Sequence, residues 1–212
     1  MKFVTKTVLA LILTVSLIID VFNAIPVSAS EKEQAYKAYY DLIEELHKGD
    51  EWSNGFDRFK LINVDNDDIP ELLAVDTPSD QFDNNGTYRY ELYTYFNGEA
   101  VKLGSYASGV ASAGGYRGDT MYIRKSGKVL ETYISAGSGD GSQIVYKMQD
   151  GAMIETAHGD FNVASENAKW NGKSMSYTKY LKKLNKAFKT TKAKSFEELK
   201  TSSYKSMRKK LK

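Results

Sequence analysis

The chain contains no cysteine, only three prolines and only two histidines in 212 residues. The absence of cysteine excludes disulfide bonds, thiol nucleophiles and thiolate metal sites. His47 and His158 stand far apart without the spacing of a metal-binding motif, so we expect both to be surface residues. No G-x-S-x-G or H-E-x-x-H motif occurs either. Local catalytic signatures are therefore scarce.

The start of the chain has the composition of a secretory signal peptide. Lys2 and Lys6 precede the apolar run VLALILTVSLIIDVF, and small residues follow it, which is the order of the n-, h- and c-regions. Val27 and Ala29 fit the −3 and −1 positions, so we expect residues 1–29 to be cleaved off before Ser30. No cysteine follows the run, which excludes a lipid-modified N-terminus, and no later apolar segment is long enough to span a bilayer. We expect a protein that is secreted or associated with the cell wall, of the Gram-positive type.

The rest of the chain indicates an α+β fold. Apolar side chains recur at three- and four-residue steps over residues 31–48, which predicts an amphipathic helix that ends at Gly49. Alternating strands follow, joined by turn signals at Asn97-Gly98, Ser126-Gly127 and Asp150-Gly151. We expect an N-terminal helix, an antiparallel β-meander or sandwich of about six to eight strands, and C-terminal helices.

The C-terminal third of the chain is predicted to be helical. A helix is predicted over residues 177–188, and Ser195 with Glu198 matches a capping box that predicts another helix. We expect residues 30–190 to form one α+β domain and residues 191–212 to form a basic helix or tail. The predicted apolar face of the first of these helices consists of Tyr177, Tyr180, Leu181, Leu184 and Phe188.

Charge is divided unevenly along the chain. From Lys169 to Lys212 there are 15 Lys and Arg against Glu197 and Glu198, which is a net charge of +13. Such a segment favours binding of phosphate-rich polymers, anionic lipid headgroups or nucleic acid. The alternative is a solvated lysine face that pairs with the acidic body. We expect a monomer that binds an anionic cell-wall polymer or another polyanion through this segment, without disulfide partners.

The stretch LINVDNDDIPELL, residues 61–73, places four carboxylates between two apolar segments. Clustered carboxylates repel one another unless a cation neutralises them. Ca²⁺ binds about six to eight oxygens, from carboxylates and backbone carbonyls together. The alternative is an Asx-rich turn without a metal. At alternate positions the stretch offers candidate metal ligands: Asn63, Asp65, Asp67, the Ile69 carbonyl and Glu71.

The spacing F-x-L-I-x-V-D-N-D-D-I-P-E-L-L resembles the calcium loop D-x-D-x-D-G-x-x-D/E of FG-GAP-type repeats and, more distantly, of EF-hands. It is more closely similar to a motif in exported proteins of Gram-positive bacteria. Those proteins also tend to carry a strand of the type E-L-Y-T-Y-x-N-G, here residues 91–98, and Gly-rich loops after it. The resemblance implies a fold and a metal, and it supplies no reaction. Asn63 stands where Asp is usual, Asp68 where Gly is usual, and Ala74 replaces the bidentate glutamate of an EF-hand, so the loop is not an EF-hand.

We therefore expect an exported, calcium-stabilised binding module that acts at or near the cell surface without catalysis. In this interpretation Ca²⁺ is structural, and we assign no catalytic residue. The alternative is a secreted polysaccharide or peptidoglycan hydrolase that uses acidic residues near the Gly-rich stretches 104–119 and 135–142. Such enzymes need two carboxylates about 5–10 Å apart, and Glu91 with Glu131 is the conceivable pair.

Overall fold

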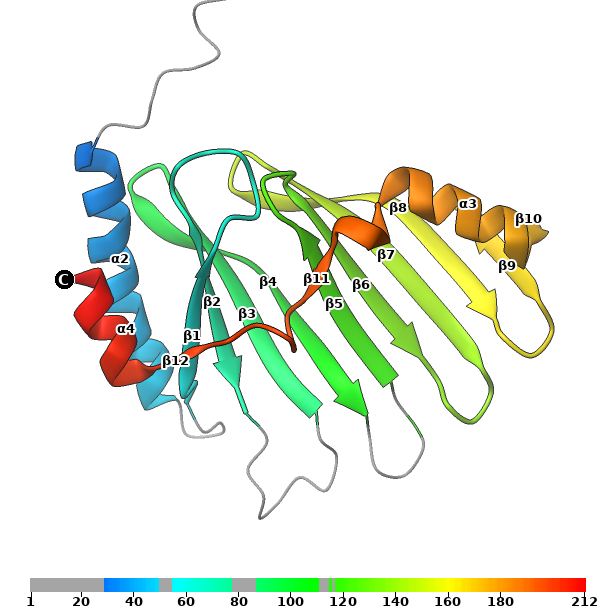
Figure 1. The fold of residues 1–212 in the computed structure, drawn as a ribbon, viewed down its shortest axis with the longest axis horizontal. Coiled ribbons are helices and arrows are strands. Elements are labelled where there is room, and N and C mark those ends of the chain that lie inside the picture. Colours follow the sequence, from blue (N-terminus) through cyan, green and yellow to red (C-terminus); the bar gives the residue numbers. More distant parts are fainter. Residues whose placement is uncertain (1–28, 50–54, 78–86, 111–114, 116) are drawn as a thin grey trace, which may run out of the picture.

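The computed structural model describes residues 29–49, 55–77, 87–110, 115 and 117–212. They form a large antiparallel sheet with three α-helices and one short 3-10 helix (Figure 1). In chain order the elements are α2 (Ala29–Lys48), β1 (Arg58–Ile62), β2 (Glu71–Asp76), β3 (Thr87–Phe96), β4 (Glu99–Val110), β5 (Arg117–Ile123), β6 (Lys128–Ile134), β7 (Asp140–Gln149), β8 (Ala152–Asn162), β9 (Asn167–Trp170), β10 (Lys173–Ser176), α3 (Tyr177–Ala187), η2 (Thr190–Lys192), β11 (Lys194–Ser195), β12 (Ser202–Ser203) and α4 (Tyr204–Leu211).

The first ten strands form a meander, in which each strand pairs antiparallel with the next along the chain. Two of the predicted turns are confirmed as two-residue hairpin loops between β3 and β4 and between β7 and β8. Their residues take positive φ angles, 53° and 92° at Asn97-Gly98 and 49° and 72° at Asp150-Gly151, as type I′ turns require. The α+β class and the antiparallel meander are therefore confirmed.

The expected number of strands is wrong, since the sheet has twelve strands in the described part of the chain rather than six to eight. The eight strands from β1 to β8 are those that the alternating pattern predicts. Two more, β9 and β10, form a short hairpin around Asn171-Gly172, whose φ angles of 48° and 76° again fit a type I′ turn. The last two, β11 and β12, have only two residues each and exist because distant strands offer them an edge.

The sheet is continuous, but its two halves, β1–β4 and β5–β10, share one core. β4 and β5 pair only where Gly109 and Val110 face Gly118 and Arg117. At the other end of these strands β4 contacts β8, although three strands lie between them in the sheet. The inner core lies between the halves, and its buried members include Val64, Leu73, Tyr90, Leu92, Tyr106, Tyr122, Val129, Met148 and Phe196.

Two further cores cover the outer faces. The α2 core lies between β1–β4 and the helices α2 and α4, and includes Tyr39, Ile43, Phe59, Leu72, Tyr93 and Met207. The α3 core lies between α3 and β6–β9, and includes Leu130, Val145, Phe161, Trp170, Tyr180 and Leu184. Figure 1 shows α2 and α4 beside β1, with α3 along the β7–β10 side of the sheet.

The C-terminal segment follows the predictions in part. The helix α3 forms as predicted and buries Tyr180 and Leu184, but Leu181 is 44% exposed and does not belong to the buried face. The capping box fails, because Ser195 lies in β11, which pairs with Met121 of β5. The Ser195 hydroxyl instead donates a hydrogen bond to Asp119 Oδ1 at 2.6 Å.

Residues 191–212 contribute to the core as well as carrying basic charge. Phe196 belongs to the inner core, while Met207 and Leu211 of α4 belong to the α2 core. The predicted signal peptide lies outside the described residues, apart from Ala29 at the start of α2. Among the helices of the described residues, none is both long and apolar enough to cross a membrane.

We expect Phe196→Ala to lower the free energy of unfolding by about 3–5 kcal/mol, because a fully buried aromatic side chain is removed and a cavity remains. Phe196 is 1% exposed and contacts the rings of Tyr90, Tyr106 and Tyr122. Urea unfolding followed by circular dichroism measures the change. Leu181→Ala, at an exposed position, is the control and should stay within about 0.5 kcal/mol. Equal stability of the two variants would contradict the packing of this segment in the core.

Candidate metal centre

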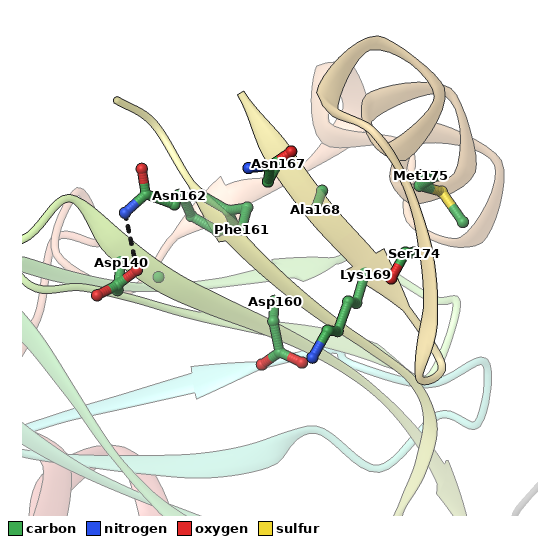
Figure 2. A pocket seen from close by; sticks show the side chains of 10 residues that line it. Asp140, Asp160, Phe161, Asn162, Asn167, Ala168, Lys169, Ser174 and Met175 are labelled. Atoms are coloured by element: carbon green, nitrogen blue, oxygen red, sulfur yellow. Dashed lines mark hydrogen bonds between the residues drawn. The ribbon is translucent and has the colours of Figure 1, made fainter. Parts of the chain in front are cut away.

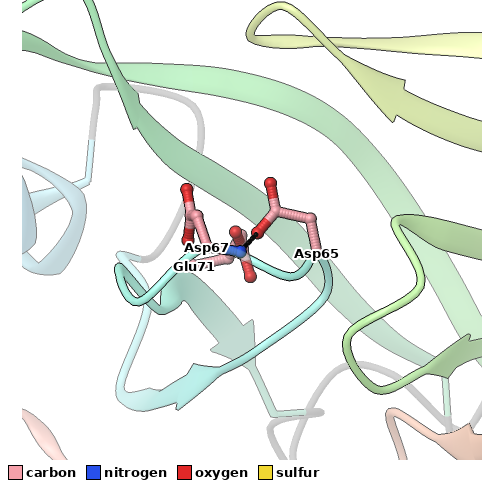
Figure 3. A group of neighbouring side chains, drawn as sticks. All are labelled: Asp65, Asp67 and Glu71. Carbon is pink, nitrogen blue, oxygen red and sulfur yellow. Dashed lines mark hydrogen bonds between the residues drawn. The ribbon is translucent and has the colours of Figure 1, made fainter. Parts of the chain in front are cut away.

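The acidic stretch forms the loop between β1 and β2, and the two strands pair up to Ile62 and Glu71. Two consecutive Asx turns shape it. The Asp67 backbone N–H donates to Asp65 Oδ1 at 3.1 Å, and the Ile69 N–H donates to Asp67 Oδ1 at 2.9 Å. Each aspartate thus folds the chain around its own side chain. As a result the side chains of Asp65 and Asp67 turn towards Glu71 (Figure 3).

The loop brings three carboxylates together. One carboxylate oxygen from each of Asp65, Asp67 and Glu71 lies within 4.8 Å of the other two. Two oxygens on opposite sides of a Ca²⁺ ion are about 4.8 Å apart, because each Ca–O bond measures about 2.4 Å. The three carboxylates can therefore hold one metal ion between them.

Glu71 is the most unusual member of the cluster. It opens β2, it is 0% exposed, and its Oε2 accepts a hydrogen bond from the Val64 N–H at 2.6 Å. Its other oxygen, Oε1, is buried without a hydrogen-bond partner among the described residues. Buried polar atoms without a partner are rare in proteins, and such an atom can mark the place where an ion or a water binds.

The protein environment raises the pKa of two of these carboxyl groups. Burial raises the pKa of Glu71 to about 8, and the neighbouring charges of Asp65 and Asp67 add to the rise. Burial and then the charge of Asp65 raise the pKa of Asp67 to about 7. Both effects penalise the ionised form, and a cation in the cluster would reverse that penalty.

A residue from α2, Tyr39, completes the surroundings of the cluster. Its side chain is 0% exposed, and its hydroxyl has no hydrogen-bond partner among the described residues. Burial raises the pKa of this hydroxyl, and the charges of Glu71, Asp67 and Asp65 raise it further, so Tyr39 lies within the electrostatic influence of the carboxylates. The helical periodicity places Tyr39 only on the apolar face of its helix, and no local signal links it to the acidic loop.

The turn between β5 and β6 anchors the start of the loop. The Lys125 N–H donates to the Asn63 carbonyl at 3.0 Å, and the N–H groups of Ser126 and Gly127 donate to the Val64 carbonyl at 2.8 and 2.7 Å. Val64 is fully buried in the inner core. The loop is thus held at both ends, by Val64 at its start and by Glu71 at its end.

Three of the five candidate ligands lie together. Asp65, Asp67 and Glu71 lie together, whereas Asn63 lines a different hollow beside Tyr122 and Arg124. The Ile69 side chain is buried in the α2 core, and its carbonyl remains a predicted ligand. Asp68 is exposed and is not a member of the cluster.

The carboxylates considered for a hydrolase lie on different faces of the sheet. Glu91 pairs with Ala74 on the face of the α2 core, and its Oε1 accepts a hydrogen bond from Lys102 Nζ at 2.6 Å. Glu131 lies on the inner face, where Tyr146 donates to its Oε2 at 3.3 Å, and burial raises its pKa. The two therefore do not share a cleft.

Two other carboxylates line a hollow of about 370 Å³ at β7–β10, next to the second Gly-rich stretch (Figure 2). They are Asp140 and Asp160. Asp140 Oδ1 accepts a hydrogen bond from Asn162 Nδ2 at 2.8 Å, and this bond and one from Ser138 lower the pKa of Asp140. A lowered pKa opposes the role of general acid, which requires a raised one.

A scan against protein-family models and searches of the curated proteins and of the solved structures found no significant match to this chain. The function is therefore inferred from the chemistry of the chain's own residues.

In the metal-free protein we expect stability to fall as pH rises from about 5 to 8.5. The pKa of Glu71 is about 8 in the folded state against an ordinary value of 4.5, so between these values the folded state binds more protons than the unfolded state. The free energy of unfolding then decreases with rising pH in this window, and Asp67 acts in the same direction below about pH 7.

Thermal melting in excess EDTA measures this dependence. For a chain of this size, a change of about 1 kcal/mol in the free energy of unfolding shifts the melting temperature by about 2–4 °C. Glu71→Gln cannot titrate, so its melting temperature should vary less over the same window. A wild-type melting temperature that rises with pH, or a variant with the same slope as the wild type, would show that Glu71 is not the titrating group.

Proposed function

We propose that the protein is an exported binding module, stabilised by Ca²⁺, that acts at or near the cell surface without catalysis. The observation that carries the proposal is the buried Glu71 carboxylate, whose Oε1 has no hydrogen-bond partner among the described residues and which lies in reach of Asp65 and Asp67. A bound cation would supply the missing partner and relieve the repulsion between the three groups.

The chemistry of the ligands supports Ca²⁺ over other metals. All three side chains offer oxygen, and neither cysteine nor histidine belongs to the cluster, which disfavours Zn²⁺ and other metals that prefer sulfur or nitrogen. Ca²⁺ accepts irregular sets of carboxylate, carbonyl and water oxygens, whereas Mg²⁺ demands a near-ideal octahedron. Binding would join the loop to β2 and stabilise the folded state.

The partner proposed for this module is an anionic polymer of the cell wall. Four lysines of α3, Lys179, Lys182, Lys183 and Lys186, are exposed. None of them forms an ion pair within the described part of the chain. The buried side of α3 packs on the sheet, so its lysine side is available to a polyanion.

We expect millimolar Ca²⁺ to raise the melting temperature relative to excess EDTA. A concentration of 100 times Kd adds about 2.7 kcal/mol, which corresponds to a shift of about 5–10 °C. Asp67→Asn should remove most of this shift, because a neutral amide replaces one carboxylate ligand. Differential scanning calorimetry measures both.

Asp68→Asn is the matched control, since it removes an equal charge from the same loop at an exposed residue outside the cluster. This variant should keep the Ca²⁺ shift, and Mg²⁺ should give a smaller shift than Ca²⁺ in the wild type. An unchanged melting temperature between EDTA and Ca²⁺ would refute the metal proposal.

Removal of the α3 lysines should weaken polyanion binding. We expect Lys182→Gln, Lys183→Gln and Lys186→Gln together to lower the affinity for polyphosphate about tenfold and to make its salt dependence shallower, because fewer counterions are released. Affinity at several salt concentrations, measured by fluorescence anisotropy, gives the slope. The triple variant of Lys32, Lys37 and Lys48 to Gln removes equal charge from α2, and an equal loss in this control would contradict the α3 surface.

A further inference from the structure

A hollow of about 500 Å³ lies where the C-terminal segment crosses the sheet. Its walls come from three distant parts of the chain: β1 and the residue after it, the end of β5, and residues 194–200. We call it the strap hollow, after the segment from β11 to β12, which lies across the middle of the sheet in Figure 1.

Positive charge dominates the strap hollow. Its lining contains Lys60, Arg124, Lys194 and Lys200, with Glu198 as the single acid. None of the five forms an ion pair with another described residue. Four cations from three segments therefore converge on one hollow, and a single carboxylate leaves most of their charge without neutralisation. Such an arrangement attracts an anion.

Hydrogen bonds from the C-terminal segment to β5 and β1 hold the walls of the hollow in place. Lys194 pairs with Tyr122 across β11 and β5, and the Phe196 N–H donates to the Thr120 carbonyl at 2.8 Å. Lys60 Nζ donates to the Lys200 carbonyl at 2.8 Å, which fixes the far end of the segment on β1. A site built in advance loses less conformational entropy when it binds its ligand.

The shape and lining of the hollow indicate what kind of anion it takes. Arg124 can donate two parallel hydrogen bonds to a phosphate, and the lysines add charge. Asn63, Tyr122 and the partly apolar wall at Leu61 and Leu199 offer contacts to a carbon-bearing unit next to that phosphate. The volume of about 500 Å³ also exceeds what a single phosphate ion needs.

The position of the hollow indicates a chain of phosphates rather than one. α3, η2 and β11 follow one another along the chain (Figure 1), and Lys194 of β11 lines the hollow. Lys189 and Lys192 are exposed on this path. A linear polyanion can therefore contact α3 and the hollow at the same time.

We propose that the strap hollow binds a phosphate group, with its attached carbon unit, of a phosphodiester-linked polymer. This inference deepens the proposed function, and it rests on the polyanion partner and not on the metal. The hollow supplies recognition of the phosphate unit, while α3 supplies affinity through charge.

The test uses the full chain and a glycerol-phosphate oligomer as the probe, with inorganic phosphate and heparin beside it, in isothermal titration calorimetry. Arg124→Gln with Lys194→Gln should lower the oligomer affinity about tenfold or more, since charge-assisted hydrogen bonds are lost. Both side chains are exposed and make no side-chain hydrogen bond to a described residue, so the fold should persist, and circular dichroism melting checks this. Glu198→Gln should raise the affinity, because it removes the only acid of the lining.

The control is Lys179→Gln with Lys186→Gln, which removes equal charge from α3 outside the hollow. This control should lower the affinities for the oligomer and for heparin alike. The hollow variant should lower the affinity for the oligomer more than the affinity for heparin. Equal losses of oligomer and heparin in the hollow variant, or an affinity for inorganic phosphate equal to that for the oligomer, would overturn the inference. If the hollow variant still binds the oligomer and the α3 variant does not, the strap hollow is not the phosphate site, but the proposed binding of a polyanion stands. No polyanion binding by the unaltered chain would remove both.

Discussion

The buried carboxylate of Glu71 is the constraint on which the rest of the structure depends. It stands at the first position of β2, where the next two residues enter different cores, Leu72 on the side of α2 and Leu73 in the interior of the sheet. Placing an ionisable group at this junction costs stability unless the group is protonated, hydrogen-bonded or bound to a metal. The Val64 N–H satisfies one oxygen, and the other has no hydrogen-bond partner among the described residues, so a proton or a cation could satisfy it.

A second constraint closes the sheet. Because β4 and β5 separate after a short pairing, β5 has a free edge and the interior has an open side. The C-terminal segment fills both, since β11 pairs with β5 and the Phe196 ring enters among Tyr90, Tyr106 and Tyr122. The same segment then pairs with β1 and ends in α4 against α2. Basic residues that surround these apolar anchors are thereby held at defined places on the surface.

The acidic loop and the basic hollow lie next to each other and share a support. The carbonyl of Asn63 accepts a hydrogen bond from the turn that also carries Arg124. Asn63 itself lines the hollow. Two residues further on, Asp65 belongs to the carboxylate cluster. The candidate cation site and the proposed anion site would then lie on either side of one short loop, where a bound cation would strengthen the positive potential that an anion meets.

Local interactions made part of this structure predictable. The helix α2, the alternation of β1–β8 and the turns at Asn97-Gly98 and Asp150-Gly151 depend on neighbours within a few residues, and the sequence pattern predicts them. The approach of Asp65 to Asp67 was also predictable, because Asx turns operate over two residues, while Glu71 is held near them by the pairing of β1 with β2 and by the Val64 N–H. The capping box at Ser195 was wrong for the opposite reason: β11 exists only because a distant strand, β5, offers it hydrogen bonds. The strand number was too low partly for that reason, at β11 and β12, and partly because the local hairpin of β9 and β10 at Asn171-Gly172 was not predicted.

The sequence by itself thus determined the class of fold, the meander and the acidic loop, since each arises from short-range periodicity or turn chemistry. Only the tertiary structure decided that the buried Tyr39 feels the charge of the carboxylates, that Asn63 lines another hollow, and that Glu91 and Glu131 occupy different faces. It also decided that the basic C-terminal segment closes the sheet. These outcomes depend on packing between segments that are distant in the chain, and no local pattern encodes such packing.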